Sequence, residues 1–202
     1  MRADSIAFAL SGILFGVIVG WILGSQQATQ PTAAVAASPA AAATAPAEGR
    51  PPAPPLDEAR LKTLVAAAGS EPANPAPRVQ LGNLYFDAER YTDAVQWYED
   101  ALRLNPKDAN VSTDLGVAYY YTNEPDKAIG QFEQSLKIDP AHTKTMLNMG
   151  IVKAFGKQDL AGASAAWQQV IATAPMSPEA QAARKALEGL KQAHPGGGPS
   201  GG

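Results

Sequence analysis

The feature that most constrains this chain is a dipeptide that recurs at a fixed interval. Leu81-Gly82, Leu115-Gly116 and Met149-Gly150 each place a glycine after a large apolar residue, and successive glycines are 34 residues apart. A period of about 34 residues is the signature of stacked helical hairpins, in which each unit buries its apolar face against its neighbours. The stretch from Pro75 to Pro175 therefore predicts an all-α helix-turn-helix solenoid.

The residues after each dipeptide resemble the tetratricopeptide repeat (TPR) family. That family has small residues where its paired helices cross, an aromatic residue in the core and a proline after the second helix. The first unit has this pattern in Tyr85, Ala94, Tyr98, Ala101 and Pro106. The second unit has it in Tyr119, Ala128, Phe132, Ser135 and Pro140. The resemblance implies a solenoid of three repeats plus capping helices.

The third unit departs from the pattern. Lys153 replaces the first aromatic residue, and one extra residue is assigned to the turn Gly156-Lys157-Gln158-Asp159. The remaining positions are then Ala163, Trp167, Val170 and Pro175. At the position where the family often carries tryptophan, the three units hold Arg78, Ser112 and Met146. The resemblance covers about half of the chain and predicts its architecture. It does not predict the function, because proteins that share a fold differ in their binding sites.

The repeat domain is expected at residues 56–194, with repeats at about 75–108, 109–142 and 143–176. The expected helix pairs are about 75–88 with 91–104, 109–122 with 125–138, and 143–156 with 160–174. A first helix capped by Asp57 has an apolar stripe of Leu61, Leu64, Val65 and Ala68. A capping helix at 178–193 follows the N-cap Ser177, and residues 195–202 are expected to form a flexible, glycine-rich tail.

After a short segment at residues 1–5, residues 6–24 form a nearly unbroken apolar run. As a helix it would be roughly 28 Å long, enough to span a bilayer. A single uncleaved transmembrane signal anchor is favoured over a cleaved signal peptide, because the small residues of Ala34-Val35-Ala36 lie far beyond the run. Arg2 precedes the run and no Lys or Arg follows it before Arg50. The positive-inside rule therefore puts the repeats on the extracytoplasmic side, which is the periplasm if this is a bacterial inner (cytoplasmic) membrane.

Within this run, glycines recur every four residues, at Gly12, Gly16, Gly20 and Gly24. Such spacing lets membrane helices pack closely, either in a homodimer or against a foreign helix. Residues 25–55 are rich in Ala and Pro and nearly uncharged, so they are expected to form a disordered linker. Whether that linker is a spacer of required length or a passive connection stays open.

The family resemblance implies a concave groove lined by the first helix of each repeat. By position, the peptide-binding residues are Asn83, Phe86, Asp87, Asn110, Asp114, Val117, Tyr120, Tyr121, Lys144, Asn148 and Phe155, together with Val79, Thr113, Leu147 and Ile151. The aromatic residues are of the kind that anchor peptides, and the asparagine amides can bond a peptide backbone. The alternative is that single aromatic residues pack beneath a neighbouring helix.

Some TPR arrays clamp the acidic C-terminal tails of chaperones with Lys and Asn side chains. Asn83 and Lys144 match that pattern, but Val79, Asp114 and Asn148 do not, so this activity is not expected.

The sequence also argues against several other classes of function. The two histidines, His142 and His194, cannot form a catalytic triad or metal cluster, and His142 is interpreted as part of a solvated turn. The absence of cysteine excludes thiolate metal sites, and a net charge of −3 without a basic stripe argues against nucleic acid. Neither catalysis, nor a cofactor, nor a metal is expected.

The preferred hypothesis is a membrane-anchored TPR adaptor or scaffold that binds a protein or peptide partner in its groove. One alternative is an assembly chaperone in cytochrome c maturation or protein secretion, whose membrane TPR proteins have a similar layout. Another is a structural, oligomer-forming membrane component without a peptide ligand. The identity of the partner stays open.

Overall fold

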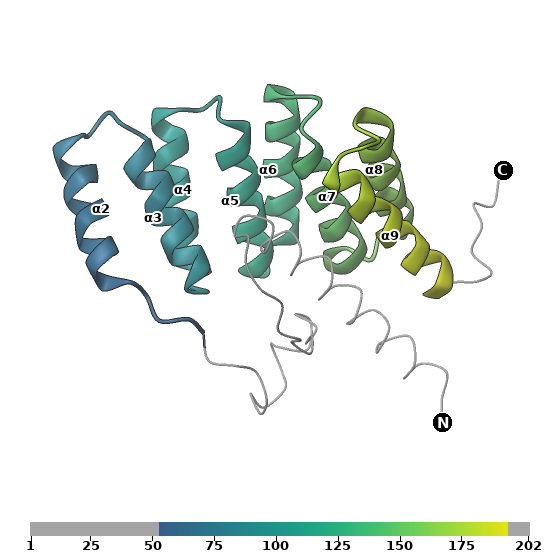
Figure 1. Cartoon of the computed structure of the whole chain (residues 1–202), viewed down its shortest axis with the longest axis horizontal. Helices are drawn as coiled ribbons and strands as arrows, with labels where there is room; N and C mark the ends of the chain where they lie inside the picture. Colours follow the sequence, from purple (N-terminus) through teal and green to yellow (C-terminus); the bar gives the residue numbers. More distant parts are fainter. Residues whose placement is uncertain (1–52, 194–202) are drawn as a thin grey trace.

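The computed structural model describes residues 53–193, which form helices joined by short turns (Figure 1). The bounds are α2 Glu58–Ser70, α3 Ala76–Asp87, α4 Tyr91–Leu104, α5 Ala109–Tyr121, α6 Pro125–Ile138, α7 Thr143–Ile151, a π-helical segment η2 at Val152–Gly156, α8 Leu160–Thr173 and α9 Pro178–Ala193. Over these described residues the chain is all-helical, which confirms the expected solenoid. Its helices begin and end within two residues of the expected bounds, except that α7 ends at Ile151, where η2 begins.

The predicted membrane span at 6–24, with Gly12, Gly16, Gly20 and Gly24, lies outside the described residues. The same holds for most of the linker and for the tail at 195–202. Among the helices between residues 53 and 193, none is long and apolar enough to cross a membrane.

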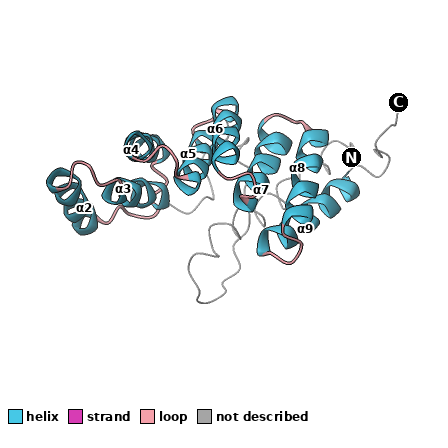
Figure 2. Ribbon diagram, turned by 90° about the horizontal axis from the view of Figure 1, so that it is seen from above, coloured by secondary structure: helices cyan, strands magenta, loops and turns pink. Residues whose placement is uncertain are grey.

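The helices alternate between two layers (Figure 2). One layer contains α3, α5 and α7, and the other contains α4, α6 and α8. The helices α2 and α9 lie at the two ends of the first layer, and the row bends so that α5 is set back from both ends. The α3, α5 and α7 layer therefore lines the concave side of the array.

Side-chain caps determine where several helices begin. Asp57, Asp108, Asp159 and Ser177 each accept a hydrogen bond from the backbone N–H three residues further on, at 2.9, 3.1, 2.8 and 3.1 Å. Such a bond satisfies an N–H group that has no partner within the helix. The predicted caps at Asp57 and Ser177 are confirmed.

The prediction of an inward stripe on the first helix holds in part. Leu64 and Ala68 of α2 are buried, but Val65 is 47% exposed.

Each repeated glycine lies against an aromatic ring from the second helix of its own repeat. A Cβ atom placed on Gly82, Gly116 or Gly150 would come within 2.5, 2.5 and 2.2 Å of ring atoms of Tyr98, Phe132 and Trp167, respectively. These three rings are 2%, 0% and 1% exposed, so they have no solvent-filled space into which to move. The 34-residue period of glycines in the sequence therefore has a steric cause, because only glycine lets the paired helices approach this closely.

The extra residue of the third repeat lies inside a helix, not in the turn to which the sequence assigned it. Asn123 and Gln158 have positive φ values of 64° and 57° and occupy equivalent places in their turns. After the first of these turns, Glu124 N–H bonds the carbonyl of Tyr119, five residues back, whereas Asp159 N–H reaches Lys153, six residues back. The π-helical segment η2 absorbs the additional residue, so the assignment to the turn was wrong.

Replacing Gly116 with alanine tests the glycine–ring contact. We expect Gly116→Ala to lower the free energy of unfolding by about 1–3 kcal/mol, because the new methyl group overlaps the ring of Phe132. The matched control is Gly130→Ala on α6, where a Cβ meets nothing within 4 Å. That control should raise stability by about 0.5–1 kcal/mol, since alanine is the better helix former. Chemical denaturation measures both, and equal changes in the two variants would contradict the steric explanation.

Candidate peptide-binding groove

The residues predicted to line the groove have very different exposures. Exposed side chains are Asn83, Asp87 and Asn110. Partly buried side chains are Val79, Asp114, Val117, Tyr120, Tyr121, Lys144 and Phe155. Buried side chains are Phe86, Thr113, Leu147, Asn148 and Ile151. The last group contributes to the core, so a ligand in the groove would meet mainly the first two groups.

Aromatic side chains from α3, α4 and α5 form one continuous cluster. The ring of Tyr121 meets the rings of Phe86 and Tyr120 edge-on, with distances between ring centroids of 5.6 and 5.9 Å. Tyr91, which the sequence analysis did not single out, stacks on Tyr121 at 4.5 Å. The prediction that these aromatic residues line the groove therefore holds in part, because Tyr120 and Tyr121 are partly exposed. The alternative, that single aromatic residues pack beneath a neighbouring helix, applies to Phe86, which lies in the core.

The remaining predicted aromatic residue lies further along the array. Phe155, in η2, packs against the buried apolar residues of α7, α8 and α9, which form the C-terminal core cluster. Tyr120 also packs against this cluster. Burial raises the pKa of the Tyr120 hydroxyl group to about 12.

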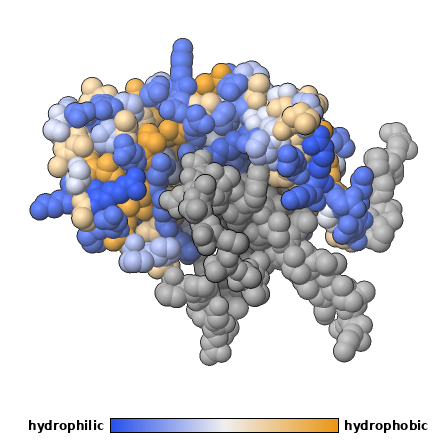
Figure 3. All heavy atoms as spheres, viewed as in Figure 1, coloured by the Kyte–Doolittle hydropathy of each residue, from blue (hydrophilic) through white to orange (hydrophobic). Residues whose placement is uncertain are grey.

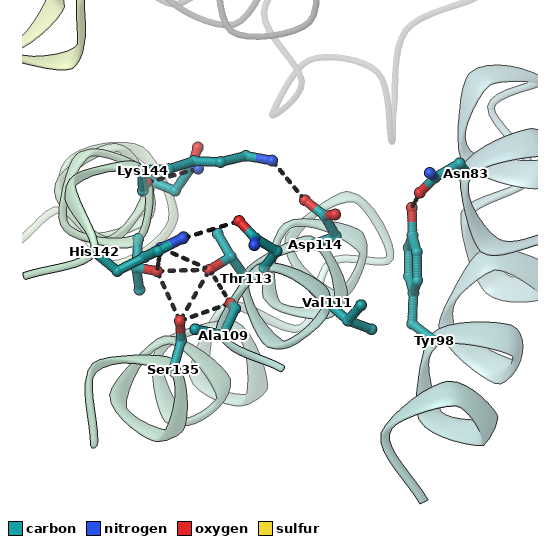
Figure 4. A network of polar contacts seen from close by, with 12 residues as sticks. Asn83, Tyr98, Ala109, Val111, Thr113, Asp114, Ser135, His142 and Lys144 are labelled. Atoms are coloured by element: carbon teal, nitrogen blue, oxygen red, sulfur yellow. Dashed lines mark hydrogen bonds and ion pairs between the residues drawn. The ribbon is translucent and has the colours of Figure 1, made fainter. Parts of the chain in front are cut away.

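Two charged residues of the groove, Lys144 and Asp114, are paired across helices (Figure 4). Lys144 Nζ of α7 lies 2.8 Å from Asp114 Oδ1 of α5, and both side chains are about two-thirds or more buried, with 31% and 26% exposure. Such a partly buried pair is screened less by salt than a surface pair. The positive charge of Lys144 is therefore already neutralised within the protein.

A second polar contact lies on the α3 side of the same opening (Figure 4). The hydroxyl group of Tyr98 donates to Asn83 Oδ1 at 2.7 Å. Burial raises the pKa of Tyr98 above its usual range, and the carboxylates of Asp114 and Asp87 raise it further. Partial burial also raises the pKa of Asp87, although Arg60 opposes that effect. The carboxylates of Asp114 and Asp87 therefore both act on the Tyr98 hydroxyl group in this part of the groove.

Beneath the groove, a hydroxyl network joins α5, α6 and α7. The hydroxyl oxygens of Thr113, Ser135 and Thr145 lie 2.6–3.0 Å from one another, and all three side chains are fully buried. Thr113 was predicted to line the groove, but the structure places it inside this network. The repeat position of Thr113 alone does not predict this burial, because its hydrogen-bond partners are 22 and 32 residues away in the sequence.

His142 extends this network to the surface and does not form the solvated turn that the sequence suggested. Its Nδ1 lies 2.6 Å from the hydroxyl oxygen of Thr145, and its Nε2 lies 3.0 Å from Asn110 Oδ1. Asn110 Oδ1 is an acceptor, so the Nε2–H group of His142 donates to it. The carbonyl oxygen of Ala109 lies 2.7 and 2.9 Å from the hydroxyl groups of Thr113 and Ser135, so the network has an acceptor besides its own hydroxyls.

Thr145→Val removes the central hydroxyl of this network while keeping its shape. We expect the free energy of unfolding to fall by about 1–3 kcal/mol, because neighbouring buried polar groups lose a partner. Thr143→Val, two residues earlier on α7, changes a partly exposed side chain outside the network and should alter stability by less than about 0.5 kcal/mol. Thermal and urea unfolding measure both variants, and near-identical effects would mean that the network adds no stability.

The arrangement suits the binding of a polypeptide. Among the described residues, no group of three or more His, Asp or Glu side chains is placed to hold a metal ion. The concave layer instead combines partly exposed tyrosines with the exposed side chains of Asn83, Asp87 and Asn110. On the face seen in Figure 3, hydrophobic residues gather over the N-terminal helices beside hydrophilic ones.

Comparisons with known proteins identify the repeat. A family model described as TPR repeat matches residues 82–123, and one described as tetratricopeptide repeat matches residues 109–142. A search of curated proteins found no match.

Solved structures share the fold at low sequence identity. The first TPR of Spaghetti (RPAP3), bound to the HSP90 peptide SRMEEVD, is 22% identical, with coverage of 59% of this chain and 92% of that chain and a TM-score of 0.54. MamA is 18% identical, with 66% and 84% coverage and a TM-score of 0.56. The Arabidopsis OM64 TPR domain is 19% identical, with 58% and 94% coverage and a TM-score of 0.54.

Proposed function

Because this chain belongs to the tetratricopeptide repeat family, we propose that it is a membrane-anchored adaptor that binds an extended segment of a partner protein in its concave groove. Domains of this family bind proteins or peptides, as the complex of Spaghetti (RPAP3) with an HSP90 peptide illustrates. The observation that carries the proposal is the pair of partly exposed rings of Tyr120 and Tyr121, supported by the buried ring of Phe86, with the exposed amide of Asn83 on the same concave layer. Aromatic anchors flanked by amides suit a peptide with apolar side chains.

The charges of the groove favour a neutral or cationic segment over an acidic tail. Lys144 is already paired with Asp114, and Asp87 adds a further carboxylate near Tyr98. An incoming carboxylate would have to compete with Asp114 for Lys144 and would meet two acidic groups. A lysine or arginine of a partner would instead meet complementary charge.

A photo-crosslinking side chain placed at Asp87 tests the use of the groove. Asp87 is exposed on α3, and the matched control position is Glu133, which is exposed on α6 in the other layer. In native membranes, we expect position 87 to crosslink a partner protein that position 133 does not. Asp87→Lys should then reduce recovery of that partner several-fold, because the groove loses an attractive charge. Equal adducts from both positions, or unchanged recovery with Asp87→Lys, would contradict binding in the groove.

The anchoring part of the proposal rests on residues 6–24, an apolar run of sufficient length to cross a bilayer as a helix. We expect the full chain to remain in the membrane pellet after alkaline carbonate extraction, and a variant without residues 1–24 to be released. Proteinase K added from the extracytoplasmic side should cleave within residues 25–55 and free the repeat domain. Release of the intact chain by carbonate, or protection from external protease, would contradict the anchor or its orientation.

A further inference from the structure

The layer opposite the groove contains a cleft of about 460 Å³. It lies between α4 and α6, which neighbour each other in that layer (Figure 2), and the α4–α5 turn and Ser112 of α5 complete its lining. Its walls are Leu102, Pro106, Lys107, Ser112, Gln131, Gln134, Lys137 and Ile138. Binding clefts for small ligands and short peptide segments commonly measure about 300–1,000 Å³, so two or three residues of a partner fill this volume.

The cleft exists because one small residue occupies a position that larger residues fill in the other repeats. Arg78, Ser112 and Met146 are equivalent by the 34-residue period. Arg78 reaches across to carbonyls of the neighbouring helix and loop, at 3.3 and 3.0 Å, and Met146 is 1% exposed within the C-terminal core cluster. Ser112 is shorter than either residue and is also 1% exposed, because Gln131 covers it and donates from Nε2 to its hydroxyl oxygen at 2.8 Å. Ser112 and Gln131 together line the cleft at this middle junction.

The walls of the cleft are cationic and partly apolar. Lys107 and Lys137 are exposed, and no carboxylate between residues 53 and 193 pairs with either of them. No acidic side chain lines the cleft, whereas Leu102 and Ile138 provide half-buried apolar surface. This chemistry is opposite to that of the concave groove, where the central lysine is neutralised.

We propose that the cleft between α4 and α6 is a second binding site, for a short acidic segment of a partner protein. A glutamate or aspartate carboxylate of that segment pairs with Lys107 and Lys137, and an adjacent leucine-like side chain packs on Leu102 and Ile138. The two sites lie in opposite layers, so one chain can hold a segment in the groove and an acidic segment in the cleft at the same time. The proposal does not depend on occupation of the groove.

The experiment uses the full chain in detergent micelles and a capped, fluorescein-labelled Leu-Glu-Glu-Leu-Glu peptide, with Leu-Gln-Gln-Leu-Gln as its neutral counterpart. Fluorescence anisotropy at low salt should show binding of the glutamate peptide alone. Lys107→Gln with Lys137→Gln should weaken this binding by about tenfold, since two ion pairs are lost. Lys185→Gln with Lys191→Gln removes the same charge from exposed positions on α9 and should leave binding unchanged.

Ser112→Met provides an independent test, because it fills the cleft as Met146 fills the next junction. It should block the glutamate peptide while circular dichroism shows unchanged helicity, and the lysine variants report on the same site without altering the core.

The proposal is overturned if no peptide binds up to millimolar concentration, if both peptides bind equally, or if both lysine pairs reduce binding alike. It is also overturned if phosphatidylglycerol vesicles, but not the peptide, bind through Lys107 and Lys137, since the basic surface then serves a membrane.

Discussion

The close approach of a glycine to an aromatic ring is the contact on which the rest of the solenoid depends. Each hairpin brings its two helices together where Gly82, Gly116 or Gly150 leaves room for a ring. That ring fills the interior of its own repeat, so the spacing between helices is set locally, within about 17 residues of sequence. The groove, the hydroxyl network and the cleft are all consequences of how hairpins of this fixed thickness stack.

Sequence reasoning was successful where a structural requirement acts over a short distance along the chain. Capping by Asp57 and Ser177 and the helix bounds follow from neighbours within one turn. It failed where the partner is remote. Thr113 has a polar side chain and a groove position by register, yet Ser135 and Thr145 draw it into the interior because their hydroxyls satisfy its own. His142 was assigned to solvent for the same reason, since its partner Asn110 is 32 residues away.

The groove and the cleft show how one lysine differs from another in what it offers a ligand. Lys144 was a candidate for binding an anion by its position, but Asp114 neutralises it at 2.8 Å. Lys107 and Lys137 carry no pattern that singles them out in the sequence, and they become notable only because the turn after α4 and helix α6 bring them to one opening. Between residues 53 and 193, the charge that a lysine can offer to a ligand therefore depends on whether the fold places a carboxylate beside it.

The π-helical segment η2 has a consequence for how such arrays tolerate insertions. Gly150 and Trp167 are one residue further apart than Gly116 and Phe132, yet their close contact is kept. Asp159 still caps α8, and the turn before it keeps the same left-handed residue. The added residue is accommodated within the 5 residues of η2, where one turn of the helix is wider than an α-helical turn. A lengthened hairpin thus stays in phase with its neighbours.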